Sequence, residues 1–153
     1  MPCPTCKGKT LHNAPCRLKT CKFAPKCYHH TPVEVKRSGV PNAGMGLFAR
    51  APIKRGEKLA NYTLNTERMT ETEFKRKYPN GRATHVAYVR SKGAYFDGKD
   101  IRKNIAGAAN TAGRRGNGRT NNAKITEAGY LTATKNIPTG REIFTVYGGG
   151  YRL

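Results

Sequence analysis

The chain has 153 residues, with 29 Lys and Arg against 9 Asp and Glu, and a formal net charge of +20. A hydrophobic content of 37% allows one modest core, and no apolar run approaches the roughly 20 residues that a bilayer requires, which excludes a membrane partner. So strong a positive field attracts polyanions in a salt-dependent way, which favours nucleic acid or a nucleoprotein as a partner and leaves the chemistry open.

The first 31 residues are rich in cysteine and histidine. All five cysteines lie within residues 1–27, and "CYHH" ends the cluster. An odd number of cysteines after a start without an apolar leader argues against a disulfide framework and predicts a reducing compartment. Thiolates and imidazoles this close in sequence suit tetrahedral zinc, which can fold a segment too short to bury a core. We therefore predict a zinc-binding segment over residues 1–31.

Two ligand sets fit the spacing of these residues. The set that we favour is compact and consists of Cys16, Cys21, Cys27 and His30 (or His29). The alternative combines the CxxC pair Cys3 and Cys6 with two of the later cysteines. A third interpretation, free thiols on an unfolded head, needs no metal at all.

Beyond residue 32 the pattern is one of short strands and turns. β-Branched and aromatic residues predict strands at 33–36, 46–49, 58–62, 85–89, 94–96, 130–133 and 142–146. The turn sequences "PNAG", "IKRG", "FDGK" and "IPTG" lie between them. A helix is expected at 71–78, because Thr70 and Glu73 form a capping box and Pro79 ends it; a second short helix is expected within 102–110.

Three stretches, in this order, resemble the SET-domain family: "GMGLFARAPIKRGEKLANY" (44–62), "YFDGKDIRKNIAGAANTAGRRGNGRTNNAKI" (95–125) and "ATKNIPTGREIFTVYGGGY" (133–151). The resemblance covers residues 33–153 and implies a SET domain over 32–153. The fold that it implies is mainly β with short helices, a SET (β-clip-like) arrangement of several small sheets with a C-terminal knot-like closure.

The resemblance implies an S-adenosylmethionine-dependent protein lysine N-methyltransferase. The two glycines of "AGMGLF" let backbone groups approach a ligand closely, and the family likeness makes Gly44, Met45 and Gly46 the loop against the methionine part of the cofactor. Asn110 matches the family's cofactor-contacting asparagine, and Thr111, which replaces the usual histidine, is expected to contact the cofactor as well.

Tyr147 matches the catalytic tyrosine of the family, which also contacts the cofactor. Lysine has a reference pKa of about 10.4, so its site must favour the neutral amine and exclude water. A narrow channel walled by tyrosine does both, and the resemblance places Tyr62 on this channel as a second catalytic candidate. Tyr151 resembles the aromatic lid of compact viral SET domains, and Ala108 stands where an aromatic residue often narrows the channel.

The expected substrate is a lysine of a histone or another chromatin protein, reached through DNA or nucleosome contact by the basic surface. Two alternatives are a non-catalytic DNA- or chromatin-binding protein with a degenerate SET fold, and a methyltransferase of a nonhistone protein. The cysteine-rich segment that follows many SET domains is missing, which leaves room for a homodimer. The expected location is the nucleus or another intracellular nucleoprotein compartment, or a virion if the protein is viral.

Overall fold

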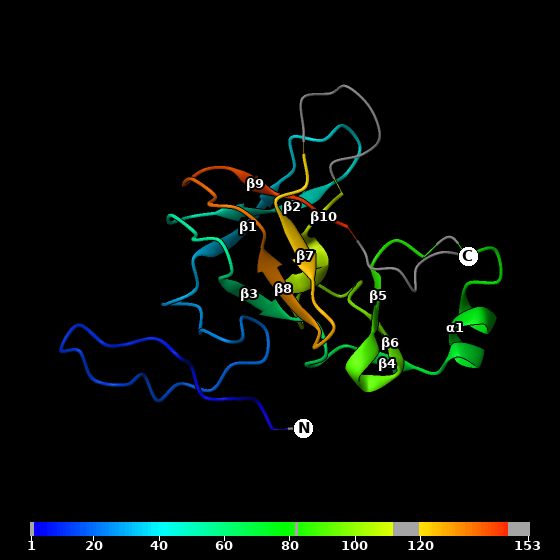
Figure 1. The fold of residues 1–153 in the computed structure, drawn as a ribbon, viewed down its shortest axis with the longest axis horizontal. Helices are drawn as coiled ribbons and strands as arrows, with labels where there is room; N and C mark the ends of the chain where they lie inside the picture. Colours follow the sequence, from blue (N-terminus) through cyan, green and yellow to red (C-terminus); the bar gives the residue numbers. More distant parts are fainter. Residues whose placement is uncertain (1, 82, 112–119, 147–153) are drawn as a thin grey trace.

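The structure is a computed structural model that describes residues 2–81, 83–111 and 120–146 (Figure 1). The strands are β1 (Val33–Arg37), β2 (Met45–Ala49), β3 (Lys58–Asn61), β4 (Glu67–Met69), β5 (Val86–Val89), β6 (Ala94–Asp97), β7 (Ala123–Ile125), β8 (Tyr130–Ala133), β9 (Glu142–Ile143) and β10 (Thr145–Val146). The helices are α1 (Glu71–Lys77) and the 3-10 helices η1 (Arg90–Lys92) and η2 (Ile105–Ala108). The expected fold, mainly β with short helices, is confirmed.

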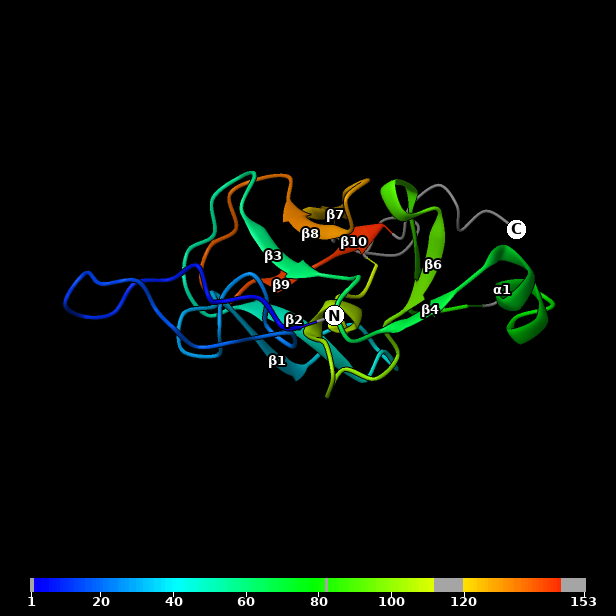
Figure 2. The same ribbon diagram turned by 90° about the horizontal axis from the view of Figure 1, so that it is seen from below.

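Two small sheets enclose the main core. One has the order β1-β2-β9 and the other β10-β7-β8-β3, and Figure 2 shows them as two layers with η2 beside them. Their inward residues, among them Leu47, Leu59, Leu131 and Ile143, are fully or almost fully buried together with η2. Burial of apolar surface between the layers therefore fixes how β2, η2 and β9 lie relative to one another.

A third sheet, β4-β6-β5, lies beside α1 at one end of the molecule (Figure 1). Thr70 caps this helix, because its side chain accepts a hydrogen bond from the backbone N–H of Glu73. Phe74 is the buried residue of the helix, and its ring stacks on Tyr95 of β6 with centroids 4.2 Å apart. This satellite core packs the insertion between β3 and η2 on itself. Ala87 and Val89 of β5, with Ala94 and Phe96 of β6, belong to the main core and so join the insertion to the body.

The cysteine-rich head forms an irregular hairpin at the opposite end (Figure 1). Its two arms share one register, in which paired residue numbers sum to 24: Thr5 faces Lys19 and Lys9 faces Pro15. Backbone hydrogen bonds from Cys6 N to Leu18 O (2.8 Å) and from Cys16 N to Gly8 O (3.0 Å) keep the same register. The head is therefore ordered by backbone pairing.

The expected strands are all present, with the last divided at Phe144 into β9 and β10. The expected helix is α1, and the second one is the short helix η2. Sequence patterns missed β4 and β7, which have only three residues each. In the described part of the chain, no helix has the length and apolar character that crossing a bilayer requires.

Candidate functional site

The two stretches predicted to bind the cofactor meet in the structure. Gly44 enters β2 with φ +71, a left-handed conformation that favours glycine, and nothing lies within 4 Å of the position of a Cβ there. The Asn110 side chain, 65 residues away in sequence, donates from Nδ2 to the carbonyl of Met45 at 3.0 Å. The hydrogen bond thus brings Asn110 beside the segment of Gly44, Met45 and Gly46 at the start of β2, where Met45 is 46% exposed.

Glu142 of β9 completes this group, although it was not among the predicted site residues. Its Oε2 lies 3.3 Å from Asn110 Nδ2 and accepts the Ser38 hydroxyl at 2.6 Å, and its Oε1 accepts the N–H of Gly39 at 2.9 Å. A Cβ on Gly46 would lie 2.6 Å from Oε2, so glycine leaves the space through which this carboxylate crosses β2. Glu142 therefore joins the β1–β2 turn to Asn110.

The partners of Asn110 decide which way its amide points. Both the Met45 carbonyl and the Glu142 carboxylate only accept hydrogen bonds, so the NH2 group must face them. The amide oxygen then points away from β2 as an acceptor. The backbone of Asn110 is fixed too, because it pairs with Phe144 and its carbonyl accepts the N–H of Thr145 at 2.9 Å.

The strand β10 leads from this pairing towards the predicted catalytic tyrosine. Tyr147 and Tyr151 lie outside the described residues, so their roles remain predictions. Thr111, which follows Asn110 and was predicted to contact the cofactor, is exposed.

The other predicted channel residues, Tyr62 and Ala108, lie in the main core. Ala108 is 4% exposed, and Tyr62 is fully buried with its hydroxyl donated to the backbone carbonyl of His85. The N–H of Gly98 also reaches this carbonyl, at 2.8 Å. The structure thus brings Tyr62 and Ala108 into one buried cluster, and the role of Tyr62 in a lysine channel stays a prediction.

A second candidate site is the cluster of Cys6, Cys16, Cys27 and His30. Their ligand atoms all lie within 4.8 Å of one another, with 4.0 Å between the sulfurs of Cys16 and Cys27. His30 Nδ1 lies 3.3 Å from the sulfur of Cys27 and 3.5 Å from that of Cys6. Burial raises the pKa of the Cys6 thiol, but hydrogen bonds from the backbone N–H groups of Cys27 and Gly8 outweigh it and lower this pKa to about 7.

This arrangement corrects the predicted ligand set. Cys21 is not a member of the cluster, because it forms a disulfide with Cys3, and Cys6 takes its place. The expectation that the cysteines form no disulfide is therefore wrong for this pair, while Cys16, Cys27 and His30 are brought together as expected.

The register of the head explains the correction. Cys3 and Cys21 have numbers that sum to 24, so they face each other across the hairpin, with Cα atoms 4.9 Å apart. Side chains along an extended arm alternate between its two faces, so Cys6 points to the face opposite Cys3. Gly8 shares the face of Cys6, and a Cβ there would lie 2.4 Å from the ring of His30. Glycine at this position therefore lets the histidine close the cluster.

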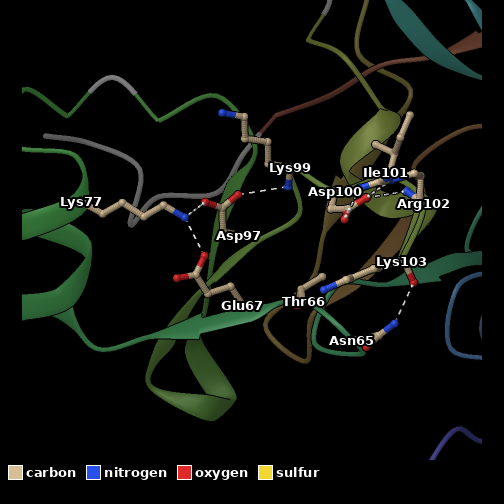
Figure 3. Close-up of a pocket in the computed structure, with 10 residues that line it drawn as sticks. All are labelled: Asn65, Thr66, Glu67, Lys77, Asp97, Lys99, Asp100, Ile101, Arg102 and Lys103. Carbon is tan, nitrogen blue, oxygen red and sulfur yellow. Dashed lines mark hydrogen bonds and ion pairs between the residues drawn. The ribbon is translucent and has the colours of Figure 1, made fainter.

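A hollow of 740 Å³ lies between the third sheet and the segment before η2 (Figure 3). At one side of it Asp97, with a side chain only 2% exposed, accepts Lys77 Nζ at 2.8 Å and the Tyr78 hydroxyl at 2.5 Å. Its other oxygen accepts the N–H of Lys99 at 3.0 Å. Burial favours the neutral acid, but these donors outweigh it and lower the pKa of Asp97. Burial and the neighbouring carboxylate raise the pKa of Tyr78 to about 12.

Comparison with known proteins identifies the fold. The family model of the SET domain matches residues 44–148. The crystal structure of the Chaetomium thermophilum polycomb repressive complex 2 is similar with a TM-score of 0.57 and 21% identity, over 80% of this chain and 16% of that chain. The structure of ctPRC2 in an autoinhibited conformation bound to S-adenosylmethionine is similar with a TM-score of 0.56 and 17% identity, over 99% of this chain and 24% of that chain.

These structures share the fold, and this chain spans less than a quarter of the length of each one. No curated protein matches the chain. The SET model covers well over half of the residues and includes the segments around Gly44, Asn110 and Glu142. The chain therefore belongs to the SET-domain family, whose members are generally protein lysine methyltransferases.

Proposed function

We propose that the protein is an S-adenosylmethionine-dependent protein lysine N-methyltransferase that acts on a histone or another chromatin protein. The observation that carries this proposal is the hydrogen bond between the Asn110 amide and the Met45 carbonyl. This hydrogen bond joins the two stretches that resemble the family's cofactor motifs. Glu142 orients the Asn110 side chain, and the pairing of Asn110 with Phe144 fixes its backbone.

The residues beside β2 fit the proposed cofactor. The open space at Gly44 lets a ligand reach the backbone, and the carboxylate of Glu142 sets the Asn110 amide so that its oxygen faces away from β2. That oxygen is suited to an amine donor such as the amino group of the cofactor. When bound, S-adenosylmethionine would supply a methyl group on a positively charged sulfur.

Deprotonation of the substrate lysine and exclusion of water would be the work of the protein's own side chains. The lysine amine must lose its proton and water must be excluded, and burial in an apolar channel favours the neutral amine. We propose Tyr147 as the tyrosine that lines this channel beside the cofactor, with Tyr62 and Ala108 in its wall and Tyr151 as its lid. Buried Ala108 has no ring to narrow the channel.

The family and the charge support the proposed substrate and place of action. The similar structures are of polycomb repressive complexes, which supports a protein substrate in chromatin and a nuclear or other nucleoprotein compartment. Histone tails are cationic and would be repelled by a chain with a net charge of +20. Contact with the DNA of a nucleosome would overcome this repulsion. A homodimer also remains a prediction.

We further propose that residues 1–31 bind structural zinc through Cys6, Cys16, Cys27 and His30 Nδ1. Zinc bonds of about 2.3 Å to sulfur and about 2.0 Å to nitrogen, in a tetrahedron, put sulfurs about 3.8 Å apart and sulfur about 3.5 Å from nitrogen. The separations of 4.0 Å between the sulfurs of Cys16 and Cys27, and of 3.3 and 3.5 Å from Nδ1 to the sulfurs of Cys27 and Cys6, are close to these values, and all four ligand atoms lie within 4.8 Å of one another. The zinc would fold a head that has little other core.

Calorimetric titration of S-adenosylhomocysteine tests the main proposal. We expect micromolar binding to the wild type, loss of binding in Asn110→Ala, and unchanged binding in Asn136→Ala. Asn136 is a matched control, because it is a surface asparagine whose side chain accepts a backbone N–H from Arg55 at 2.9 Å. Both variants should have the far-UV spectrum of the wild type.

The outcomes separate the candidate functions. Folded wild-type protein that gives no heat would contradict the proposal and leave a non-catalytic DNA- or chromatin-binding protein. If the cofactor analogue binds, methyl transfer to a panel of histone and nonhistone proteins, detected by mass spectrometry, distinguishes a histone methyltransferase from one that acts on other proteins.

A further inference from the structure

Three aromatic rings form a continuous cluster where the head joins the body. The ring of Tyr28 packs edge-on against Phe23 and against His29, with centroids 5.6 Å apart in both pairs. Two cations lie over these rings: Lys22 Nζ is 5.3 Å from the centroid of Phe23, and Arg50 Cζ is 5.2 Å from that of Tyr28. We call these five residues the Tyr28 platform. Tyr28 itself remains 60% exposed.

The backbone holds the Tyr28 platform in place. Tyr28 directly follows Cys27, whose carbonyl accepts the N–H of His30 at 3.0 Å and that of Thr31 at 2.8 Å. The guanidinium of Arg50 donates to the carbonyl of Tyr28 and, through Nε at 2.8 Å, to that of Thr31. An exposed ring that is fixed before binding loses little conformational entropy when a ligand stacks on it.

Tyr28 lines two hollows. One, of 510 Å³, includes Lys26, His29 and Arg50 in its wall, and the other, of 370 Å³, includes Lys22, Phe23 and Arg50. The acidic residues among their lining have partners of their own: Glu34 pairs with Lys36 at 3.3 Å, and Glu57 accepts the N–H of Lys54 at 3.4 Å. An extended ligand that occupies both hollows would therefore contact Tyr28 and have a lysine near it in each hollow.

The charge of the segment favours an anionic ligand. Residues 1–31 contain six Lys and Arg and no Asp or Glu. An acidic protein segment would satisfy the cations and gain little from a flat exposed ring. Unpaired nucleic-acid bases offer flat faces that stack on tyrosine, and the phosphates between them pair with lysine and arginine.

We propose that the Tyr28 platform binds single-stranded nucleic acid, with one unpaired base stacked on Tyr28 and the adjacent phosphates near Lys22 and Lys26. This inference does not depend on methyl transfer, because the platform belongs to the head and to Arg50 and shares no residue with the proposed cofactor site. It assigns to the head a specific ligand class beyond its general positive charge.

Fluorescence anisotropy of the full chain with labelled oligothymidine of about 12 nucleotides, within the usual range of site sizes, tests the proposal. We expect Tyr28→Ala to weaken binding between about 5-fold and about 150-fold, which is the range for loss of one stacked base. Tyr28→Leu should weaken it similarly, because leucine is large and apolar but has no flat face. Tyr28→Phe should bind as the wild type does.

Salt dependence tests the phosphate contacts. Lys26→Ala should reduce the slope of log binding constant against log salt concentration by about 0.7, the value for one phosphate contact on a single strand. Lys75→Ala is the matched control: it removes the same charge from α1, at the opposite end of the molecule (Figure 1), where Lys75 pairs with Glu71 at 3.0 Å. It should leave the slope unchanged.

Several results would overturn the proposal. Absence of binding at low salt, wild-type affinity in folded Tyr28→Ala and Tyr28→Leu, or tighter binding of a duplex of equal length would each exclude a base stacked on Tyr28. Equal competition by poly-glutamate at the same charge concentration would point to an acidic protein partner. Zinc content and far-UV spectra identify any variant whose head has unfolded. If Tyr28→Ala is one of them, the affinities of Tyr28→Phe and Tyr28→Leu are compared instead.

Discussion

Replacing Asp97 with asparagine should lower the free energy of unfolding by about 2 kcal/mol at neutral pH. The asparagine would keep the shape of the side chain and one acceptor oxygen, which suffices for the N–H of Lys99 at 3.0 Å. The atom that replaces Oδ2 would be an NH2 group facing Lys77 Nζ at 2.8 Å, so two donors would oppose each other. The Tyr78 hydroxyl can rotate and accept instead.

The expected loss of about 2 kcal/mol follows from the burial of the Asp97 carboxylate and from the partial exposure of its partner Lys77. A hydrogen bond to a charged group contributes about 1.5–3 kcal/mol, and the buried carboxylate of Asp97 is such an acceptor. Lys77 is 39% exposed along its side chain, so water screens the ion pair and its Coulombic part contributes no more than about 1 kcal/mol. For a chain of this size, a loss of about 2 kcal/mol corresponds to a fall in Tm of about 4–8 °C.

The pH dependence gives the sharper test. The pKa of Asp97 is lower in the folded state than its ordinary value, so this stabilisation is fully present above about pH 4 and is lost as the pH falls through the folded-state pKa. Urea unfolding at neutral pH and at successively lower pH should show the difference between wild type and Asp97→Asn shrinking. A difference that stays constant down to about pH 2, below the ordinary range of the carboxyl pKa, would refute the electrostatic explanation.

Glu67→Gln is the control for this experiment. Glu67 also contacts Lys77, at 2.6 Å, but its side chain is 57% exposed (Figure 3). Exposed ion pairs contribute little, so the substitution should change the free energy of unfolding by less than about 1 kcal/mol. An equal loss in both variants would mean that burial of Asp97 has no part in the effect.

Two further predictions concern the body and the head. Gly107→Ala should lower the free energy of unfolding in urea by at least about 2 kcal/mol, because the new Cβ would lie 1.9 Å from the backbone oxygen of Gly98. Gly39→Ala is the control: the atom closest to its new Cβ is 3.7 Å away, so the free energy of unfolding should change by less than about 0.5 kcal/mol. Mass spectrometry of metals should find one zinc per chain in the purified wild-type protein. The single variants Cys6→Ser and Cys27→Ser should lose this zinc, because each lacks a proposed ligand. The double variant that combines Cys3→Ser with Cys21→Ser should retain it. Loss of zinc in the double variant alone would restore Cys21 as a ligand.

The sequence predicted most of the fold because its signals are local. Alternating β-branched residues and turn sequences locate strands such as β1 and β8, and the capping box of Thr70 and Glu73 locates α1 within one residue of its end. β4 and β7 were missed because three residues are too few to show alternation. Their pairing with β6 and β8 is a tertiary contact that no local pattern contains.

The metal ligands were only partly predictable, because spacing along the chain does not say which face a side chain occupies. Cys21 lies closer in sequence to Cys16 than Cys6 does, yet pairing of the arms places it opposite Cys3. Once the register of Thr5 with Lys19 is known, alternation alone separates Cys3 and Cys21 from Cys6 and Cys16. The missing information was therefore a single number, the register of the hairpin.

The cofactor site shows a different limit. Gly44, Gly46 and Asn110 stand out as sequence motifs, because glycine geometry and an amide at a fixed place leave a signature. Glu142 lies in the third family-like stretch, but an acidic residue after a turn is common on any surface, so the motif did not reveal what Glu142 does. Its role arises only when β9 pairs with β2 and brings Phe48 opposite Glu142, which puts the carboxylate over Gly46 and within reach of Asn110. A residue that acts by orienting another is thus hidden until the strands that carry both are paired.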